Sequence, residues 1–335
     1  MNTSANEVSM GVGLFPTESV HRICALTRLA EESGYSNVWF GDSQNIWREA
    51  YVTIGAAAAA TSRIVIGTGV TNALTRHPSV IASAWATLSE MTGGRAVCGI
   101  GAGDSSLRTM GLQPMALADL ERAVSDIREA WRCESVAERS GGTSYHLEYL
   151  SQPRDIPLYI AASAPKILRL SGRIADGVIV LVGTEQRFID AALAAIDEGA
   201  REAGRSRTDL HIVLWTPTAI DVDASRAHDL VRAHVARVII RPLPATLDEE
   251  KLAAIDKVRA SYDYYQHMQT SAHHGDLVTD DLVDLFALAG TPESCRSRIA
   301  ELKQSGVDQI AIVPFVPPGG DRAATIATFA DLFSG

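Results

Sequence analysis

Short apolar runs alternate with amphipathic stretches along almost the whole chain. Most of the runs are uniformly apolar, which is typical of strands buried on both faces of a parallel sheet. The stretches between them repeat their apolar residues at the helical period. The predicted strands are 8–14, 37–40, 64–70, 96–100, 158–162, 177–181, 211–215 and 309–314, and the predicted helices include 19–32, 116–132, 166–174, 185–204 and 292–305.

Eight successive βα units predict an α/β fold, a closed TIM-type (β/α)8 barrel. Such a barrel needs about 250 residues, so part of this 335-residue chain must lie in insertions. We expect one at about 133–157, with a hairpin after Gly141-Gly142, and a mainly helical one at about 216–290, with helices over 226–240 and 247–268. Because there is no repeat, linker or change of composition, we expect residues 1–335 to form a single domain.

The segment 64–104 combines two strands, a helix and two loops of small residues. Pro78 suits the first turn of the helix, and Gly93-Gly94 ends it. The second loop contains closely spaced glycines, but they follow the fourth predicted strand rather than the first, and Asp104 stands where a dinucleotide fingerprint has glycine. The pattern therefore argues against an open dinucleotide-binding sheet and favours another cofactor.

Composition narrows the choice of partners. The chain is 46% hydrophobic and has a formal net charge of −10, which argues against nucleic acid or an anionic membrane surface as the main partner. A small-molecule substrate fits better.

Cysteine spacing and hydropathy bear on the location of the protein. Four distant cysteines without a C-x-x-C spacing are expected to be reduced thiols, and no apolar run is long enough to span a bilayer. We expect a cytoplasmic protein.

Small and polar residues follow four of the predicted strands. In a parallel barrel the loops after the strands carry function, although turns favour the same residue types. These candidate residues are Asp42 and Gln44 after the second strand, Thr68, Gly69, Val70 and Thr71 after the third, Gly101 and Gly103 after the fourth, and Ala162, Ser163 and Ala164 after the fifth.

Each candidate also has a structural interpretation. The loop at 162–166 precedes a helix, whose free N–H groups favour a phosphate, but Ser163 is equally suited to capping the helix. Asp42 could orient a polar group of a ligand or cap a helix. Trp47 could form a ligand wall or pack in the core.

A cluster of tyrosines and histidines lies in the larger expected insertion. These residues could line a substrate pocket or donate protons. No metal-binding spacing accompanies them, so no metal is predicted, and His273 and His274 are interpreted as surface or interface residues. The cluster consists of Tyr262, Tyr264, Tyr265, His267, His273 and His274.

Four segments in this order resemble the luciferase-like flavin and deazaflavin oxidoreductase superfamily, especially its methylenetetrahydromethanopterin reductase-like branch. They are GTGVTNALTRHP, LSEMTGGRAVCGIGAGD, AASAPKILRLSGRIADGVIV and AGTPESCRSRIAEL. The resemblance covers nearly the whole chain. It implies a TIM-type barrel, usually a homodimer, that binds coenzyme F420 (8-hydroxy-5-deazaflavin) or FMN. The segment 75–78 follows the deazaflavin pattern.

The resemblance also assigns roles to individual residues. It implies a non-prolyl cis peptide at Gly69-Val70 behind the ring and an acidic residue, Asp42, beside it. It implies a phosphate loop at 162–164, where Ala164 replaces the usual glycine, and backbone contacts from Gly177 and Val178. Ser43 stands where many members have histidine, so His267 and Gln44 become the candidate proton-transfer residues beside Asp42.

The resulting expectation is an oxidoreductase in which reduced coenzyme F420 transfers a hydride to a small organic substrate lying between Trp47, Gln44, Tyr262 and His267. Three alternatives remain open at this stage. They are a reduced-FMN-dependent monooxygenase, a non-catalytic flavin-binding protein, and a cofactor-independent barrel lyase or hydrolase, the last lacking an obvious acid/base set.

Overall fold

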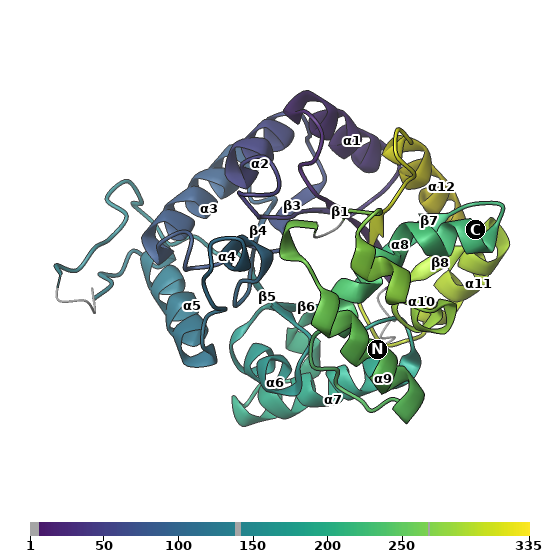
Figure 1. Cartoon of the computed structure of the whole chain (residues 1–335). Coiled ribbons are helices and arrows are strands. Elements are labelled where there is room, and N and C mark those ends of the chain that lie inside the picture. Colours follow the sequence, from purple (N-terminus) through teal and green to yellow (C-terminus); the bar gives the residue numbers. More distant parts are fainter. Residues whose placement is uncertain (1–6, 138–141, 267–268) are drawn as a thin grey trace, which may run out of the picture.

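The protein is a closed parallel barrel surrounded by helices, seen along its axis in Figure 1. The structure, a computed structural model, describes residues 7–137, 142–266 and 269–335. In these residues eight strands form a ring in the order β6, β5, β4, β3, β2, β1, β9 and β7, and β7 pairs back to β6. The predicted TIM-type barrel is confirmed. Its strands are β1 Ser9–Leu14, β2 Asn37–Phe40, β3 Val65–Thr68, β4 Ala96–Ile100, β5 Leu158–Ala162, β6 Gly177–Val180, β7 His211–Ile220 and β9 Gln309–Pro314.

Helices connect the strands and cover the outside of the barrel (Figure 1). The helices are α1 Val20–Glu32, α2 Ala50–Ala59, α3 Pro78–Thr92, α4 Ser105–Arg108, α5 Leu117–Trp131, α6 Pro165–Ile174, α7 Gln186–Glu202, α8 Ala224–Ile239, α9 Glu249–Ser261, α10 Asp280–Phe286, α11 Pro292–Leu302 and α12 Arg322–Ser334, with 3-10 turns η1 Arg207–Asp209, η2 Tyr264–Gln266 and η3 His273–Leu277. Among the described residues no helix combines the length and apolar character that crossing a membrane requires.

Local sequence signals set the ends of these helices. Pro78 occupies the first turn of α3, and Gly93 ends it in a left-handed conformation, as predicted. Ser19 caps α1 by accepting a hydrogen bond from the Arg22 backbone N–H. These signals fix where α1 and α3 begin and where α3 ends.

The seam between the first and last barrel strands is closed by a polar network. Gln309 on β9 is fully buried, accepts a 2.8 Å hydrogen bond from Trp39 Nε1, and donates one of 2.8 Å to Asn37 Oδ1. A buried amide is tolerated because its donors and acceptor are all paired. This network closes the barrel at the end opposite the strand C-termini.

The expected insertions are only partly as predicted. Strand β7 continues to Ile220, so the larger insertion does not begin at 216. A short strand that was not predicted, β8 Leu288–Gly290, pairs with the end of β7. The helix predicted over 247–268 ends at Ser261, because Tyr262 adopts an extended conformation. In the described part of 133–157 an antiparallel bridge joins Val136 and Tyr145; Gly141 lies outside the described residues.

Candidate functional site

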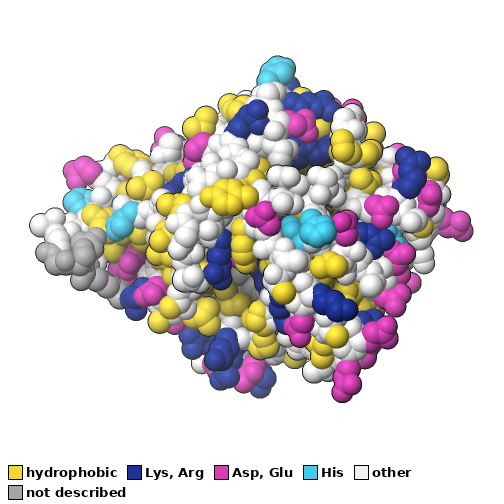
Figure 2. All heavy atoms as spheres, in the orientation of Figure 1, with side chains coloured by type: hydrophobic (Ala, Val, Ile, Leu, Met, Phe, Trp, Pro, Cys, Tyr) yellow, Lys and Arg dark blue, Asp and Glu magenta, His cyan; other side chains and the backbone are white. Residues whose placement is uncertain are grey.

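A cavity of about 500 Å³ opens at the C-terminal mouth of the barrel. Figure 2 shows a hollow near the middle of this face in which basic and hydrophobic side chains are visible. A volume of this size suits a cofactor or a small organic ligand. The predicted site residues that line it are Asp42, Trp47, Gly69, Val70, Gly101, Gly103, Ala162, Ser163 and Ala164.

Glycine and alanine keep one wall of the cavity smooth. The peptide bond between Gly69 and Val70 is cis, as the resemblance implied. A Cβ atom on Gly69 would lie 2.8 Å from the Trp215 ring, and one on Gly101 would lie 2.9 Å from Val70. Any side chain at these positions would force neighbouring groups to move. The wall therefore depends on small residues where backbone approaches the cavity closely.

Asp42 lines the cavity, and its two carboxylate oxygens have different surroundings. Its Oδ2 accepts a 2.8 Å hydrogen bond from Thr71 Oγ1 and a charged hydrogen bond from Arg76, which also pairs with Glu49. Its Oδ1 is buried and has no hydrogen-bond partner within the described parts of the chain. A buried acceptor without a partner is costly, so Oδ1 is suited to receive an N–H or O–H from a ligand.

The environment of Asp42 changes its acidity. Burial raises the pKa of this carboxyl, and the Arg76 guanidinium and the Thr71 hydroxyl offset only part of the rise. Arg76 is itself fixed, because its guanidinium lies 4.2 Å from the centre of the Tyr51 ring. The carboxyl is therefore positioned rigidly at the end of β2.

The loop between β5 and α6 has the features of a phosphate site. Ala164 is the N-cap residue and gives no side-chain cap, so the first N–H groups of α6 are not satisfied by it. Ser163 is buried at the edge of the cavity, and Lys166 lines the cavity as well. The alternative interpretation of Ser163 as the helix cap is wrong. Free N–H groups, a hydroxyl and an ammonium together suit an anion.

Several predicted contact residues lie behind the cavity wall. Thr68 exchanges hydrogen bonds with the Gly99 backbone at 2.6 and 3.1 Å, and Thr71 contacts Asp42 rather than the cavity. Gln44 donates to the Ser106 carbonyl at 3.2 Å. These side chains support the loops around the mouth and do not line it.

The placement predicted for Gly177 and Val178 is wrong. Gly177 is the first residue of β6, so it lies at the opposite end of the barrel from the cavity, against Tyr159. Val178 is fully buried in the core. The C-terminal end of β6 contributes Ile179 and Leu181 to the cavity instead, because in a parallel barrel only the ends of the strands reach the mouth.

The tyrosine and histidine cluster divides in two. Tyr264 lines the cavity, whereas Tyr262 does not and packs with its ring centre 4.2 Å from that of His274. His274 is buried, so its interpretation as a surface residue is wrong, while His273 is exposed beside Asp276. His267 lies outside the described residues. Burial raises the pKa of Tyr262, which keeps its hydroxyl protonated.

Aromatic rings enclose the deep part of the cavity. Phe15 stacks on Trp47 with ring centres 4.5 Å apart, and it meets the Trp215 ring edge-on at 6.3 Å. Trp47 is only 9% exposed yet lines the cavity. Both of the interpretations open for Trp47, core packing and ligand wall, therefore hold. Such a lining excludes water from a bound ligand.

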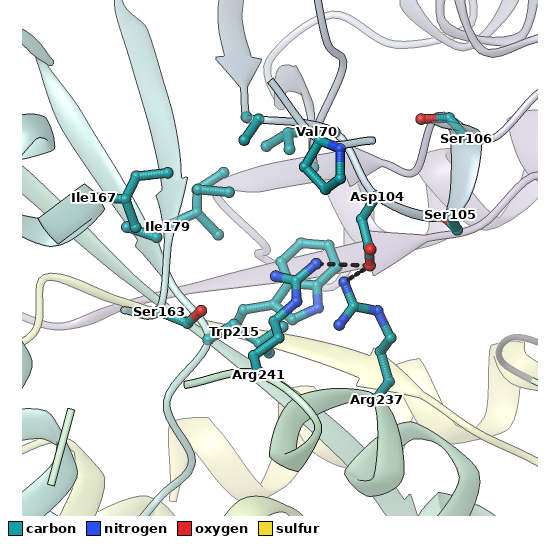
Figure 3. A pocket seen from close by; sticks show the side chains of 18 of the residues that line it. Val70, Asp104, Ser105, Ser106, Ser163, Ile167, Ile179, Trp215, Arg237 and Arg241 are labelled. Atoms are coloured by element: carbon teal, nitrogen blue, oxygen red, sulfur yellow. Dashed lines mark hydrogen bonds and ion pairs between the residues drawn. The ribbon is translucent and has the colours of Figure 1, made fainter. Parts of the chain in front are cut away.

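Three cavity-lining residues on or just after α8 were not predicted: His234 and Arg237 on the helix, and Arg241 two residues beyond its end. Arg237 and Arg241 both form ion pairs with Asp104, the latter at 3.0 Å, as the dashed lines in Figure 3 show. Arg108 approaches the same carboxylate at 3.9 Å. His234, one turn before Arg237, is 2% exposed and lines the cavity. The sequence contained one signal for these residues, since charged residues and a histidine stand among the valines of α8.

His234 is a neutral residue in this environment. Burial, helped by the nearby Arg237 guanidinium, lowers the pKa of its imidazole to about 3. Neither ring nitrogen has a hydrogen-bond partner among the residues described. Its ring neighbours are Phe15 and Phe315, with ring centres at 6.3 and 5.1 Å.

These features together fit a flat, anionic cofactor. The small-residue wall at Gly69 and Gly101 leaves room for a ring, Asp42 Oδ1 can accept a hydrogen bond from its edge, and the start of α6 can hold its phosphate. The fold and the site therefore define a TIM-barrel enzyme whose binding cavity is built by the loops after the strands.

The chain belongs to the luciferase-like monooxygenase family, whose model matches residues 3–309. It is 30% identical over 328 residues to a 5,10-methylenetetrahydromethanopterin reductase from Methanolobus tindarius, covering 94% of this chain and 97% of that protein. It is also 30% identical to an F420-dependent glucose-6-phosphate dehydrogenase from Microbacterium testaceum, covering 90% and 89%.

A solved structure agrees with these matches. The coenzyme F420 dependent tetrahydromethanopterin reductase from Methanopyrus kandleri superimposes with a TM-score of 0.79 at 27% identity, covering 97% of each chain. The family resemblance inferred from the four sequence segments is confirmed.

Proposed function

We propose that this protein is an oxidoreductase that binds coenzyme F420 at the barrel mouth and uses its reduced form to transfer a hydride to a small organic substrate. The observation that carries this proposal is the match along nearly the whole chain to proteins named for F420 dependence. A shared fold alone would not support it, because TIM barrels host many chemistries. The composition of the cavity wall agrees with the proposal.

Each part of the cavity has a role in this proposal. The backbone at Gly69, Val70, Gly101 and Gly103 supports the ring of the cofactor, and Asp42 Oδ1 accepts a hydrogen bond from its polar edge. The first N–H groups of α6 hold its phosphate. Bound in this way, the cofactor supplies the hydride, and the chain supplies orientation and a dry environment.

The substrate occupies the part of the cavity that the cofactor leaves open. We place it between Trp47 and the α8 face, above Trp215. The stacked rings of Phe15 and Trp47 keep water away from the reacting carbon. Tyr264 is a titratable group of the cavity lining that can exchange a proton with the substrate oxygen, since both oxygens of Asp42 are already engaged in this proposal.

The test is a titration of the purified protein with coenzyme F420 and, separately, with FMN, monitored by absorbance and fluorescence. We expect saturable F420 binding and no comparable FMN binding. FMN binding alone would favour the monooxygenase alternative, and binding of neither would refute the assignment of the cavity. Binding of F420 without turnover of any electron donor or acceptor would identify a non-catalytic cofactor-binding protein.

We also propose that the protein is a homodimer formed through α2 and α3. A groove of about 250 Å³ between these helices is lined by Tyr51, Ile54, Gly55, Ala84, Trp85 and Met91, among others. Nearby, Val52 is 69% exposed and Val80 is 51% exposed. A continuous apolar surface of this kind marks an interaction site more often than an isolated exposed residue does.

A cytoplasmic location is part of the same proposal. All four cysteines are free, and Cys133 is exposed. An exposed free thiol is compatible with a reducing compartment, where disulfides are rare. Fractionation of the producing cells, with activity assayed in each fraction, tests this location.

A further inference from the structure

Three buried polar atoms on one face of α8 have no hydrogen-bond partner in the part of the chain that the structure describes. They are Nδ1 and Nε2 of His234 and Nη1 of Arg237, and both side chains line the cavity. The residues are three positions apart, so their side chains lie on the same face of the helix, about 5 Å apart along its axis. A neutral imidazole always carries one N–H donor and one acceptor nitrogen. The protein itself supplies neither partner within its described residues.

The charges around Arg237 are not balanced. Three guanidinium groups, those of Arg108, Arg237 and Arg241, surround the single carboxylate of Asp104. Asp42 does not compensate for them, because it is paired with Arg76. A locally positive cavity in a chain of net charge −10 attracts anions specifically to this place.

This cluster is separate from the phosphate loop. Figure 3 shows Ser163 on one side of Trp215 and Asp104 with Arg237 on the other side, while Arg241 lies in front of Trp215 between them. Arg237 therefore lies away from the phosphate loop, on the side of the cavity where we place the substrate, and Arg241 lies between the two.

Resting on the proposed function, we infer that the substrate is an organic anion. Its carboxylate or phosphate binds Arg237 and Arg241 in place of Asp104, and a hydroxyl or carbonyl oxygen a few bonds away hydrogen-bonds to His234. A guanidinium fork matches either anion in bidentate geometry. The neutral imidazole can donate a hydrogen bond to a carbonyl or accept one from a hydroxyl. His234 can therefore hydrogen-bond to the oxidised and to the reduced form of the substrate.

The test uses three probes with the F420-loaded protein and with the cofactor-free protein: glycerol 3-phosphate, inorganic phosphate and glycerol, measured by calorimetry. We expect both phosphates to bind and glycerol not to bind. Arg237→Met should weaken both phosphates at least tenfold, whereas Arg226→Met, an exposed arginine on the same helix, should change neither. His234→Phe should weaken glycerol 3-phosphate severalfold and leave inorganic phosphate unchanged.

The outcomes separate this inference from the proposed function. Failure of F420 to bind refutes the function, while the difference in phosphate affinity between wild type and Arg237→Met in the cofactor-free protein still tests the anion site, because the phosphate loop is the same in both proteins. If wild-type protein binds no phosphate, or if Arg237→Met lowers F420 affinity instead of phosphate affinity, the inference is wrong. Should Arg237→Met lower thermal stability, Arg237→Lys keeps the charge without the fork and is expected to bind phosphate with intermediate affinity.

Discussion

Thr71 Oγ1 donates a 2.8 Å hydrogen bond to Asp42 Oδ2, joining the loops after two neighbouring barrel strands. This bond holds one oxygen of a carboxylate that lines the cavity, and the other oxygen, Oδ1, is buried without a partner among the described residues. The position of one charged atom at the mouth therefore depends on residues from two loops.

Asp42→Asn should weaken F420 binding. Hydrogen bonds to charged groups contribute about 1.5–3 kcal/mol, so we expect the dissociation constant to rise about 10- to 100-fold. Fluorescence titration measures it. Glu49→Gln is the matched control, since Glu49 is the other partner of Arg76 and does not line the cavity. Equal affinities of Asp42→Asn and wild type would exclude Asp42 as a cofactor contact.

Gly69→Val should abolish or strongly reduce F420 binding. Its Cβ would lie 2.8 Å from the Trp215 ring, so the ring or the loop must shift into the cavity. Gly55→Ala is the control, because a Cβ added at Gly55 would meet no described atom within 4 Å. Cofactor affinity and circular dichroism are compared for the two variants. Unchanged affinity in a folded Gly69→Val protein would contradict the small-residue wall.

His234→Phe should make the protein more stable and less active. Removing two buried nitrogens that lack partners among the described residues, next to Phe15 and Phe315, should raise the free energy of unfolding by about 1–2 kcal/mol. Urea denaturation of the cofactor-free protein measures it. His228→Phe, on the same helix but beside Asp280 and Asp284, should give no such gain. A loss of stability in His234→Phe would mean that the imidazole serves the fold.

Glu31→Gln should destabilise the protein at neutral pH and not at low pH. Burial alone would raise the pKa of Glu31. Hydrogen bonds from the backbone N–H groups of Ser62, Arg63 and Ile64 lower the pKa by more than burial raises it, so the pKa lies below its usual value. A lowered folded pKa stabilises the protein above the unfolded pKa, near 4.3, and that stability is lost as pH falls through the folded pKa. Because Glu31 is partly exposed, we expect about 1 kcal/mol at pH 7.

Thermal melts of Glu31→Gln at pH 7 and pH 3 measure this difference. The neighbouring Glu32→Gln serves as control, since Glu32 is exposed. A deficit of equal size at both pH values would show that the charge of Glu31 is not the cause.

Val52→Glu combined with Gly55→Glu should convert the proposed dimer to a monomer. Both positions lie on α2 beside the apolar groove, and unpaired charges in such an interface are unfavourable. Light scattering coupled to size exclusion gives the molar mass. Val222→Glu, at a valine 87% exposed before α8, should leave the mass unchanged. A wild-type monomer would refute the proposal directly.

The barrel could be predicted because its strands are buried on both faces and so appear as apolar runs. The four-residue strand β2 is entirely buried and its bounds were predicted correctly. Strand β8 could not be recognised, because three residues carry no periodicity. The extension of β7 through Pro217 was equally hidden, because proline argues against a central strand.

The site was predictable where a loop follows a strand end, as at Asp42 and Gly69. The prediction for Gly177 fails because this residue begins β6, whereas only the C-terminal end of a barrel strand reaches the mouth. The α8 residues were missed for a different reason. Whether His234 and Arg237 face the cavity depends on the rotation of α8 over the barrel, which tertiary packing decides and local sequence does not.

The hydrogen bond from Trp39 on β2 to Gln309 on β9 joins residues 270 positions apart, beside the seam where β1 pairs with β9. During synthesis, β1 must therefore wait as an open sheet edge until nearly the whole chain has left the ribosome. Contacts this distant in sequence slow folding, and an unpaired apolar edge invites aggregation. Production of this protein should consequently benefit from slow expression and chaperones, because the pairing of β1 with β9 that closes the barrel forms last.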